Sequence, residues 1–305
     1  MEFFKTNTNI DFMGQRKYAL IFSLLLFVAS VAVTVVKGIN LGLDFTGGTQ
    51  IEMSHNDSIN IPAARETLTK NGFAGIIVQT YGSSNHILIR IPTNNAMTPN
   101  KIKNKIAASL PNLTIDKVEF IGPQVGKTLM TNGIMALIIS LLLTMLYIAV
   151  RFEYRFALSA AISLIHDPIL IMGVFAALDL EFNLIALAAL LTILGYSLND
   201  TIVVYDRIRE NFKKHRNIDA AGIVNLSINQ TLSRTIMTSG LTSLVVIALI
   251  AYAGEILQGF SIALMTGIII GTYSSIYIAG SLAVYFGLDK QSLLPKAKNT
   301  ASSMP

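Results

Sequence analysis

Long apolar runs separated by short polar segments dominate the chain. The first run covers residues 18–36, which is about the length that a helix needs to cross the ~30 Å hydrocarbon core of a bilayer. Five further runs follow at about residues 129–150, 156–178, 183–205, 236–253 and 260–286. The pattern predicts a polytopic α-helical membrane protein with six transmembrane helices, the last five within residues 128–288.

The first apolar run also has features of a cleaved signal peptide, because Ser30 and Ala32 provide the small residues of a cleavage site. However, the run continues to Val36 and exceeds the ~7–15 residues of a typical signal core. We therefore expect an uncleaved anchor helix, preceded by the polar segment 1–17.

Residues 37–127 are polar and mixed, and short strand-like and helix-like segments alternate within them. The strand candidates are residues 50–53, 75–81, 86–92 and 115–121, and the helix candidates are 62–71 and 98–110. Thr98 and Pro99 suit the start of the second helix. The order strand, helix, strand, strand, helix, strand predicts one small α+β domain of ferredoxin-like type between transmembrane helices 1 and 2.

Positive side chains gather on one side of the predicted membrane. They lie in residues 1–17, 151–155, 206–235 and 289–305, whereas the connections around Asp179 and Glu255 contain no Lys or Arg. The positive-inside rule then places both termini, the loop 206–235 and the tail 289–305 in the cytoplasm. The α+β domain is expected on the other side, in the periplasm or at the cell exterior.

Composition supports this class of protein. Hydrophobic residues make up 52% of the chain and charged residues only 13%, whereas soluble proteins carry about 25% charged residues. The absence of Cys excludes disulfide bonds, thiol catalysis and Cys-ligated metals. The sequence shows no metal-ligand cluster, no catalytic triad and no basic–aromatic surface for nucleic acid. We therefore expect no enzyme activity, no cofactor and no metal.

Residues 122–128, GPQVGKT, superficially resemble a phosphate-binding loop. That motif requires four residues between its glycines, and this segment has three. The predicted orientation also places the segment outside the cytoplasm, away from ATP. We therefore expect no nucleotide site here.

Asp200 is an acid inside the fourth apolar run, and Ile202 and Val203 continue the run after it. An acid in a membrane-spanning helix is costly and is a functional candidate by default. The alternative is an acid at the helix end that reaches the interface. Ser197 lies one turn earlier on the same helical face.

Arg234 is the candidate partner of Asp200, because it lies at the start of the fifth run at a matching depth. A pair that forms and breaks would act as a protonation switch, whereas a static salt bridge or a contact with lipid phosphate is the alternative. Asp167, near the middle of the third run, is either a second relay group or a structural hydrogen-bond acceptor. Hydroxyl groups such as those of Ser197 and Thr238 are candidates for holding water beside a buried acid, although helix packing also explains the small residues of these runs.

Five stretches, in order along the chain, resemble the SecF family of subunits of the bacterial Sec protein-translocation complex. They are LGLDFTGGT at 41–49, IGPQVGKTL at 121–129, SLNDTIVVYDRIREN at 197–211, TLSRTIMTS at 231–239 and GTYSSIYIA at 271–279. The resemblance covers nearly the whole chain, and each stretch stands at the topological place that the family requires.

This resemblance implies an RND-type half transporter that pairs with SecD to complete a twelve-helix unit. It implies a Sec accessory role in the bacterial cytoplasmic (inner) membrane, driven by the proton-motive force after the step of SecA and the SecYEG channel. The implied partners are SecD, SecYEG, the translocating polypeptide and membrane lipids, with SecA indirect and YajC a further candidate. In the family, the acid of the SLND motif and the arginine of the TLSRT motif take part in proton transfer, which assigns these roles to Asp200 and Arg234.

Glycines mark the two connections between the α+β domain and the membrane helices. Gly47, Gly48, Gly122 and Gly126 suit hinges, although tight turns are the plain alternative. Two other functions remain open at this point: an RND-like half exporter of small molecules, and a scaffold subunit without proton coupling.

Overall fold

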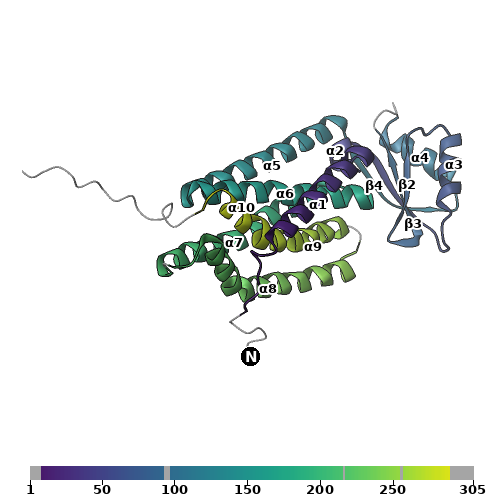
Figure 1. Ribbon diagram of the computed structural model, residues 1–305. Helices are drawn as coiled ribbons and strands as arrows, with labels where there is room; N and C mark the ends of the chain where they lie inside the picture. Colours follow the sequence, from purple (N-terminus) through teal and green to yellow (C-terminus); the bar gives the residue numbers. More distant parts are fainter. Residues whose placement is uncertain (1–7, 93–96, 216, 255–256, 289–305) are drawn as a thin grey trace, which may run out of the picture.

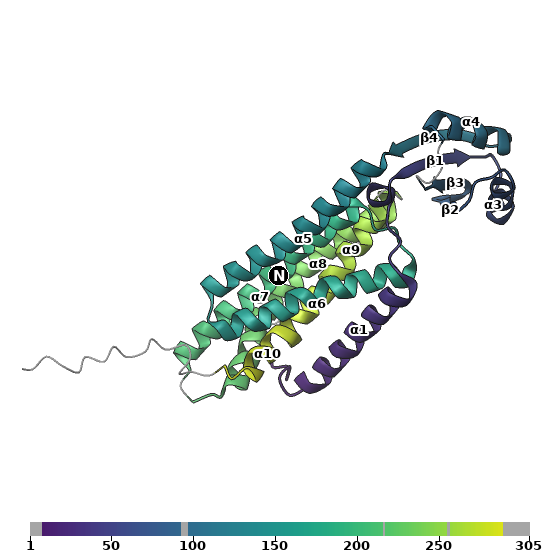
Figure 2. The same cartoon turned by 90° about the horizontal axis from the view of Figure 1, so that it is seen from above.

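The computed structural model describes residues 8–92, 97–215, 217–254 and 257–288. It consists of a helical bundle with a small α+β domain at one end, which we call the domain end (Figures 1 and 2). Six helices of the described residues are long and apolar enough to cross a membrane, as the sequence predicts. They are α1 (Arg16–Lys37), α5 (Pro123–Arg151), α6 (Tyr154–Leu178), α7 (Leu184–Lys214), α8 (Ala220–Tyr252) and the continuous helix α9 (Gln258–Tyr273), η2 (Ser274–Ala279) and α10 (Gly280–Tyr285).

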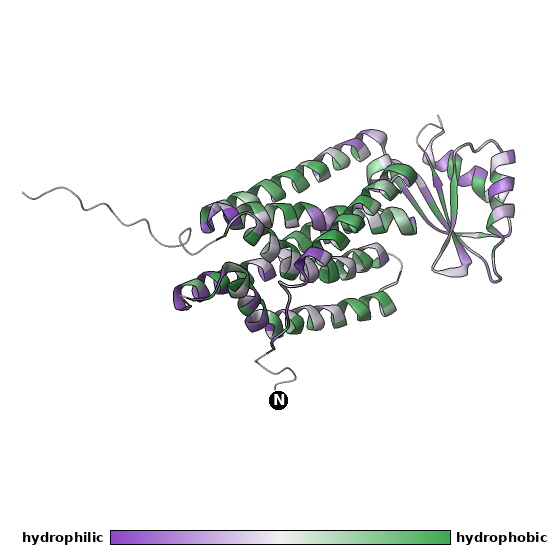
Figure 3. Ribbon diagram, in the orientation of Figure 1, coloured by the Kyte–Doolittle hydropathy of each residue, from purple (hydrophilic) through white to green (hydrophobic). Residues whose placement is uncertain are grey.

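The helices differ in how far they are covered by the protein itself. Half or more of the apolar part of α6, α7 and the last helix is buried, whereas α1, α5 and α8 lie outside and are mostly exposed. Figure 3 shows hydrophobic residues along the outer helices. The large apolar side chains that are exposed there include Leu24, Leu25, Leu142, Leu143, Leu244 and Val245. This surface is suited to lipid or to another membrane-spanning chain, because apolar side chains there need not be shielded from water.

The segment 206–235 differs from the predicted loop because it is almost entirely helical. Helix α7 continues to Lys214 and α8 begins at Ala220, where Asp219 accepts a hydrogen bond from Gly222 N at 3.0 Å as the N-cap. The apolar run ends before these turns, but the helices do not, since polar side chains stabilise their extensions. The predicted tail 289–305 lies outside the described residues.

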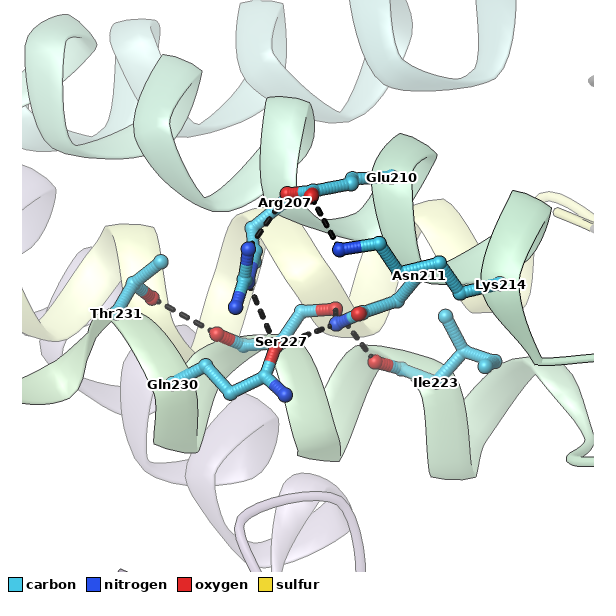
Figure 4. Close-up of polar contacts among 8 residues, drawn as sticks. All are labelled: Arg207, Glu210, Asn211, Lys214, Ile223, Ser227, Gln230 and Thr231. Atoms are coloured by element: carbon cyan, nitrogen blue, oxygen red, sulfur yellow. Dashed lines mark hydrogen bonds and ion pairs between the residues drawn. The ribbon is translucent and has the colours of Figure 1, made fainter. Parts of the chain in front are cut away.

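Hydrogen bonds hold the extended ends of α7 and α8 together (Figure 4). Glu210 accepts from Lys214 Nζ at 2.6 Å, one helical turn away, and also pairs with Arg207. Asn211, which is buried, donates to Ser227 Oγ on α8 at 2.9 Å. Charged pairs at this spacing support a helix in water, so the bundle protrudes beyond its apolar part at this end.

The α+β domain has the predicted ferredoxin-like topology. Its elements are β1 (Gly48–Ser54), α3 (Ile61–Lys70), β2 (Ile77–Tyr81), β3 (Ser83–Ile91), α4 (Pro99–Ser109) and β4 (Thr114–Ile121). The sheet order is β2-β3-β1-β4 with antiparallel pairs throughout. Ile51, Met53 and Ile89 point from the strands to Leu68 and Ile106 of the helices and form a dry core.

The domain is fastened to the bundle at several points. Arg90 of β3 forms an ion pair with Glu181, in the connection between α6 and α7. Phe182 N donates to Asn40 O at 2.8 Å, and Gly42 N donates to Phe182 O at 2.9 Å. The connection after α1 is therefore paired with the α6–α7 connection.

The predicted hinge glycines lie where backbones approach closely. Gly47, at the end of α2 (Leu43–Thr46), has a φ of +65°, and a Cβ on Gly126 would stand 2.9 Å from Gly47 N. A Cβ on Gly48 would stand 2.4 Å from Ile91 O. Gly122 has an ordinary φ of −63° and open space around it. Close packing therefore accounts for three of the four glycines, and a hinge role stays a prediction.

Candidate functional site

Asp167 is the centre of a polar cluster inside the bundle. Its side chain is fully buried in α6. Its Oδ2 accepts hydrogen bonds from Ser197 Oγ of α7 at 2.6 Å and from Ser274 Oγ of η2 at 2.9 Å, and its Oδ1 lies 3.0 Å from His166 Nδ1. Hydrogen bonds to an ionised acceptor are about twice as strong as neutral ones, so this carboxylate is well satisfied.

His166 extends the cluster to the outer helix α1. Its Nε2 lies 2.7 Å from Ser23 Oγ, and both side chains are buried. Its ring stacks on Phe27, with ring centroids 6.2 Å apart and an interplanar angle of 12°. One continuous set of hydrogen bonds therefore connects α1, α6, α7 and η2 near the middle of the bundle.

Local sequence explains why these side chains meet. Pro168 has no N–H and leaves a carbonyl of the preceding turn without its usual helical partner, directly beside the cluster. Gly271 allows close approach, because a Cβ there would stand 2.9 Å from Ser197 Cβ. The π-helical turn η2 begins at Ser274, and such turns are frequent at functional sites.

Asp200 is the second buried acid of the bundle and has different surroundings. It lies one turn beyond Ser197 on α7 and is 4% exposed, and its Oδ2 is buried without a hydrogen-bond partner among the described residues. Burying an ionised carboxyl group without a partner is costly. A change in its proton occupancy would therefore alter the stability of the surrounding helix packing.

The structure does not join Asp200 and Arg234 directly. No ion pair or hydrogen bond links these two described side chains, although the guanidinium charge still acts on the carboxyl group. Arg234 is exposed on α8. The expected switch pair is thus separated in this state of the chain.

The hydroxyl groups singled out from the sequence fall into two groups. Ser197 belongs to the acid cluster, whereas Thr238 Oγ1 donates to Arg234 O of its own helix at 3.1 Å and touches neither acid. Ser23 and Ser274 were not predicted. Ser274 stands in a family-like stretch but was hidden among other small residues, and Ser23 is one hydroxyl in an otherwise apolar run, whose partner helix the sequence does not reveal.

This arrangement can take up and release protons, since it contains two carboxyl groups, an imidazole and several hydroxyl groups. It is enclosed by apolar helix surfaces, so a change of charge inside it acts strongly on packing. Within the part of the chain that the structure describes, no group of three acidic or histidine side chains is placed to bind a metal ion.

Comparisons with known proteins agree with this architecture. The model of the C-terminal region of protein export membrane proteins SecD/SecF matches residues 101–289, and the model of the SecD/SecF GG motif matches residues 32–54. The chain is 43% identical to the protein translocase subunit SecF of Vibrio alginolyticus, covering 95% of this chain and 94% of that relative. It is 41% identical to the same subunit of Pseudomonas aeruginosa, covering 97% and 98%.

Solved structures give the same result. The crystal structure of SecDF, a translocon-associated membrane protein from Thermus thermophilus, matches with a TM-score of 0.85 and 36% identity over 93% of this chain. SecDF in its super-membrane-facing form matches with a TM-score of 0.69 and 37% identity over 92% of this chain. The chain spans 39% of the length of each of these solved chains. It therefore belongs to the SecD/SecF family of protein export membrane proteins, on the SecF branch.

Proposed function

We propose that the chain is an accessory subunit of the Sec translocase that uses the proton-motive force to promote polypeptide translocation across, and insertion into, the bacterial cytoplasmic membrane. Its relatives are named protein translocase subunits, and the SecDF of Thermus thermophilus is described as a translocon-associated membrane protein. The observation that carries the proton part is the carboxyl group of Asp200, buried in a membrane-spanning helix with an unpartnered oxygen.

In this proposal Asp200 binds the transported proton. A charge that crosses 100 mV changes the free energy by about 2.3 kcal/mol, which is comparable to the cost of one misplaced packing contact. When Asp200 is neutral, the helices α7 and α8 pack in one way. When it is ionised, Arg234 is drawn towards it, and the helices shift. The shift passes to the α+β domain, which acts on the emerging polypeptide.

A SecD subunit is the proposed partner inside the membrane. The chain matches 39% of each SecDF chain, and a SecD-type half would supply much of the remainder and complete a twelve-helix unit. The exposed apolar faces of α8 and of the other outer helices are suited to such a contact. SecYEG, the polypeptide and lipids are further partners, with SecA indirect and YajC a candidate.

The proposed orientation follows from charge. The end of the bundle opposite the α+β domain carries more Lys and Arg, among them Arg16, Arg151 and Lys214, than the domain end, where Lys37 and Lys127 lie. The positive-inside rule assigns the more basic end to the cytoplasm. Both termini are then cytoplasmic and the domain is extracytoplasmic. The chain catalyses no chemical reaction in this proposal and needs no cofactor, because the gradient supplies the energy.

The test uses proteoliposomes that contain the chain with its SecD partner and SecYEG, supplied with SecA and a secretory polypeptide. Asp200→Asn should abolish the part of translocation that an imposed proton gradient stimulates. Asp206→Asn is the matched control, because Asp206 lies on the same helix, is half exposed and pairs with Arg151 at 3.1 Å. It should keep the stimulation. Repeating the assay with a sodium gradient identifies the ion.

Two outcomes would contradict the proposal. If Asp200→Asn assembles normally and keeps the full stimulation, the chain is a scaffold in which Asp200 has no proton role. If the chain alone exports a small dye from vesicles without SecD, it is an independent exporter and not an accessory subunit.

A further inference from the structure

We propose that His166 and Asp167 form a proton-holding site separate from Asp200, and that α1 responds to its charge and passes the response to the α+β domain. This inference rests on the proposed function, because it adds a second site to the same proton-driven machine. It concerns a pair of side chains to which the motifs of the family-like stretches assign no role.

Hydrogen-bond chemistry limits the states of this site. A neutral imidazole carries one N–H, so when Nδ1 donates to Asp167 Oδ1, Nε2 must accept from the Ser23 hydroxyl across the 2.7 Å contact. One proton taken up from water makes both ring nitrogens donors, and the charge of the pair changes from −1 to 0. Ser23 Oγ then has to accept and turn its own hydrogen away. The contact between α6 and α1 is thereby rebuilt.

Helix α1 contacts the His166 ring and is therefore exposed to its change of charge. Ser23 and Phe27 are four residues apart and lie on one helical face, so both touch the His166 ring. Two further contacts hold α1 at other levels: Tyr273 OH donates to Ala19 O at 2.6 Å, and Lys37 Nζ donates to Ala177 O at 2.8 Å. Contacts with α9 and α6 therefore hold α1 along its length, as far as the domain end.

The path from α1 to the domain is short. Residues 38–47, which include the short helix α2, connect the end of α1 to β1. Within this connection, Gly42 N donates to Phe182 O at 2.9 Å. A change in the tilt or position of α1 therefore displaces the connection that is hydrogen-bonded to the α6–α7 turn. Hydrogen exchange at the amide of Gly42 is sensitive to that displacement.

The remaining ionisable side chains near α6 have other contacts or stand elsewhere. On α7, Tyr205 OH bonds Ser159 Oγ at 2.7 Å, Tyr196 OH bonds Ser239 Oγ at 3.3 Å, and Asp200 makes no hydrogen bond to the cluster. The charged side chains of α7 beyond Asp200 begin at Asp206 and lie in the polar extension of that helix. The others on and around α6 are Arg16, Lys17, Tyr18 and Lys37 of α1, Lys127, Tyr147 and Arg151 of α5, Tyr154 and Arg155 of α6 itself, Tyr273 of α9, Tyr277 of η2 and Tyr285 of α10. Within its apolar part, α1 thus contacts His166, which is bonded to Asp167, and Tyr273, whose OH donates to Ala19 O.

The experiment measures the full chain in lipid nanodiscs, without SecD or translocation. Hydrogen exchange of residues 38–47 is followed across a pH series, together with the infrared ring bands of histidine, which are assigned to His166 by difference from His166→Gln. In the native chain, exchange in this connection should change with a pH midpoint that matches the titration of His166. His166→Gln and Asp167→Asn should abolish that change. Ser23→Ala should abolish it as well while the infrared titration remains, which separates sensing from proton binding.

Three controls make the outcome decisive. Ser30→Ala changes a partly buried serine of α1, and Ser163→Ala changes a buried serine of α6 whose hydroxyl has no hydrogen-bond partner within the described part of the chain. Both should keep the native pH response, and Asp200→Asn should keep the midpoint that His166→Gln removes. The proposal is wrong if Ser23→Ala keeps that midpoint or if Asp200→Asn removes it. Because no polypeptide is translocated, these results stand apart from the proton role of Asp200; should Asp167→Asn not fold, His166→Gln and Ser23→Ala decide.

Discussion

Asp167 and Asp200, the buried acids of the described bundle, differ in every contact. Asp200 lies one helical turn beyond Ser197, whose hydroxyl donates to Asp167. Asp167 accepts from two serines and a histidine on three helical elements, whereas Asp200 Oδ2 has no partner among the described residues. A fully bonded carboxylate ties helices together, while an unpartnered one leaves its surroundings dependent on a proton or on another chain. The comparison therefore assigns Asp167 to transmitting a change of charge within the subunit, and Asp200 to binding and releasing the transported proton.

The largest difference between the two acids is expected in stability. Asp167→Ala should lower the free energy of unfolding by about 3–5 kcal/mol, because it leaves an imidazole and two buried hydroxyls without their shared acceptor. Asp200→Ala should cost much less, since it orphans no partner. Denaturant titration in mixed micelles measures both. Equal losses for the two variants would remove the distinction.

The close approach of α9 to α7 at Gly271 should give the next largest effect on the free energy of unfolding. Gly271→Leu forces atoms into Ser197 and should destabilise by about 1–3 kcal/mol through overpacking. Gly195→Leu is the matched control on α7, because nothing lies within 4 Å of a Cβ at that position. It should leave the free energy of unfolding almost unchanged in the same titration. A tolerated Gly271→Leu would mean that α7 and α9 are not tightly apposed.

The single bond from α7 to Asp167 should contribute less. Side-chain hydrogen bonds between membrane helices are worth about 0.6 kcal/mol on average and at most about 1.7, so Ser197→Ala should cost an amount in this range. Ser163→Ala, which removes a buried hydroxyl without a partner, should cost nothing measurable. If the two variants are equal, the Ser197–Asp167 bond does not contribute to stability.

The smallest effect on stability is expected at Arg234. Because no acidic side chain of the described residues forms an ion pair with Arg234, Arg234→Gln should change the free energy of unfolding by less than about 0.5 kcal/mol and yet abolish gradient-stimulated translocation. Arg151→Gln, which removes an exposed pair with Asp206, should be similarly mild in stability but keep translocation. A large stability loss for Arg234→Gln would instead indicate a structural salt bridge.

The elements were largely predictable from the sequence because each has a local signal. Six apolar runs marked the membrane helices, and Thr98–Pro99 and the alternating strands marked the ferredoxin-like domain. The exception was the segment 206–235, where the apolar signal ends while the helices continue. Their support comes from bonds such as Asn211 to Ser227, which depend on the hairpin already being formed.

The site was only half predictable, for a physical reason. Polarity inside an apolar run identified Asp167 and Asp200, since a buried acid is costly wherever it lies. It did not say which acid is bonded, because Ser274, which donates to Asp167, is more than 100 residues away along the chain. Ser23, which bonds the neighbouring His166, is equally distant in sequence. It also paired Asp200 with Arg234 by depth alone, and depth does not fix which face of α8 the arginine occupies.

One measurement decides whether the unpartnered acid carries the proton: gradient-stimulated translocation of Asp200→Asn and Asp206→Asn in matched proteoliposomes, with equal amounts of assembled complex. The unpartnered Oδ2 of Asp200 predicts that stimulation vanishes in Asp200→Asn while translocation driven by SecA alone persists, and that Asp206→Asn behaves as the native chain does. Full stimulation in Asp200→Asn would show that the proton passes elsewhere.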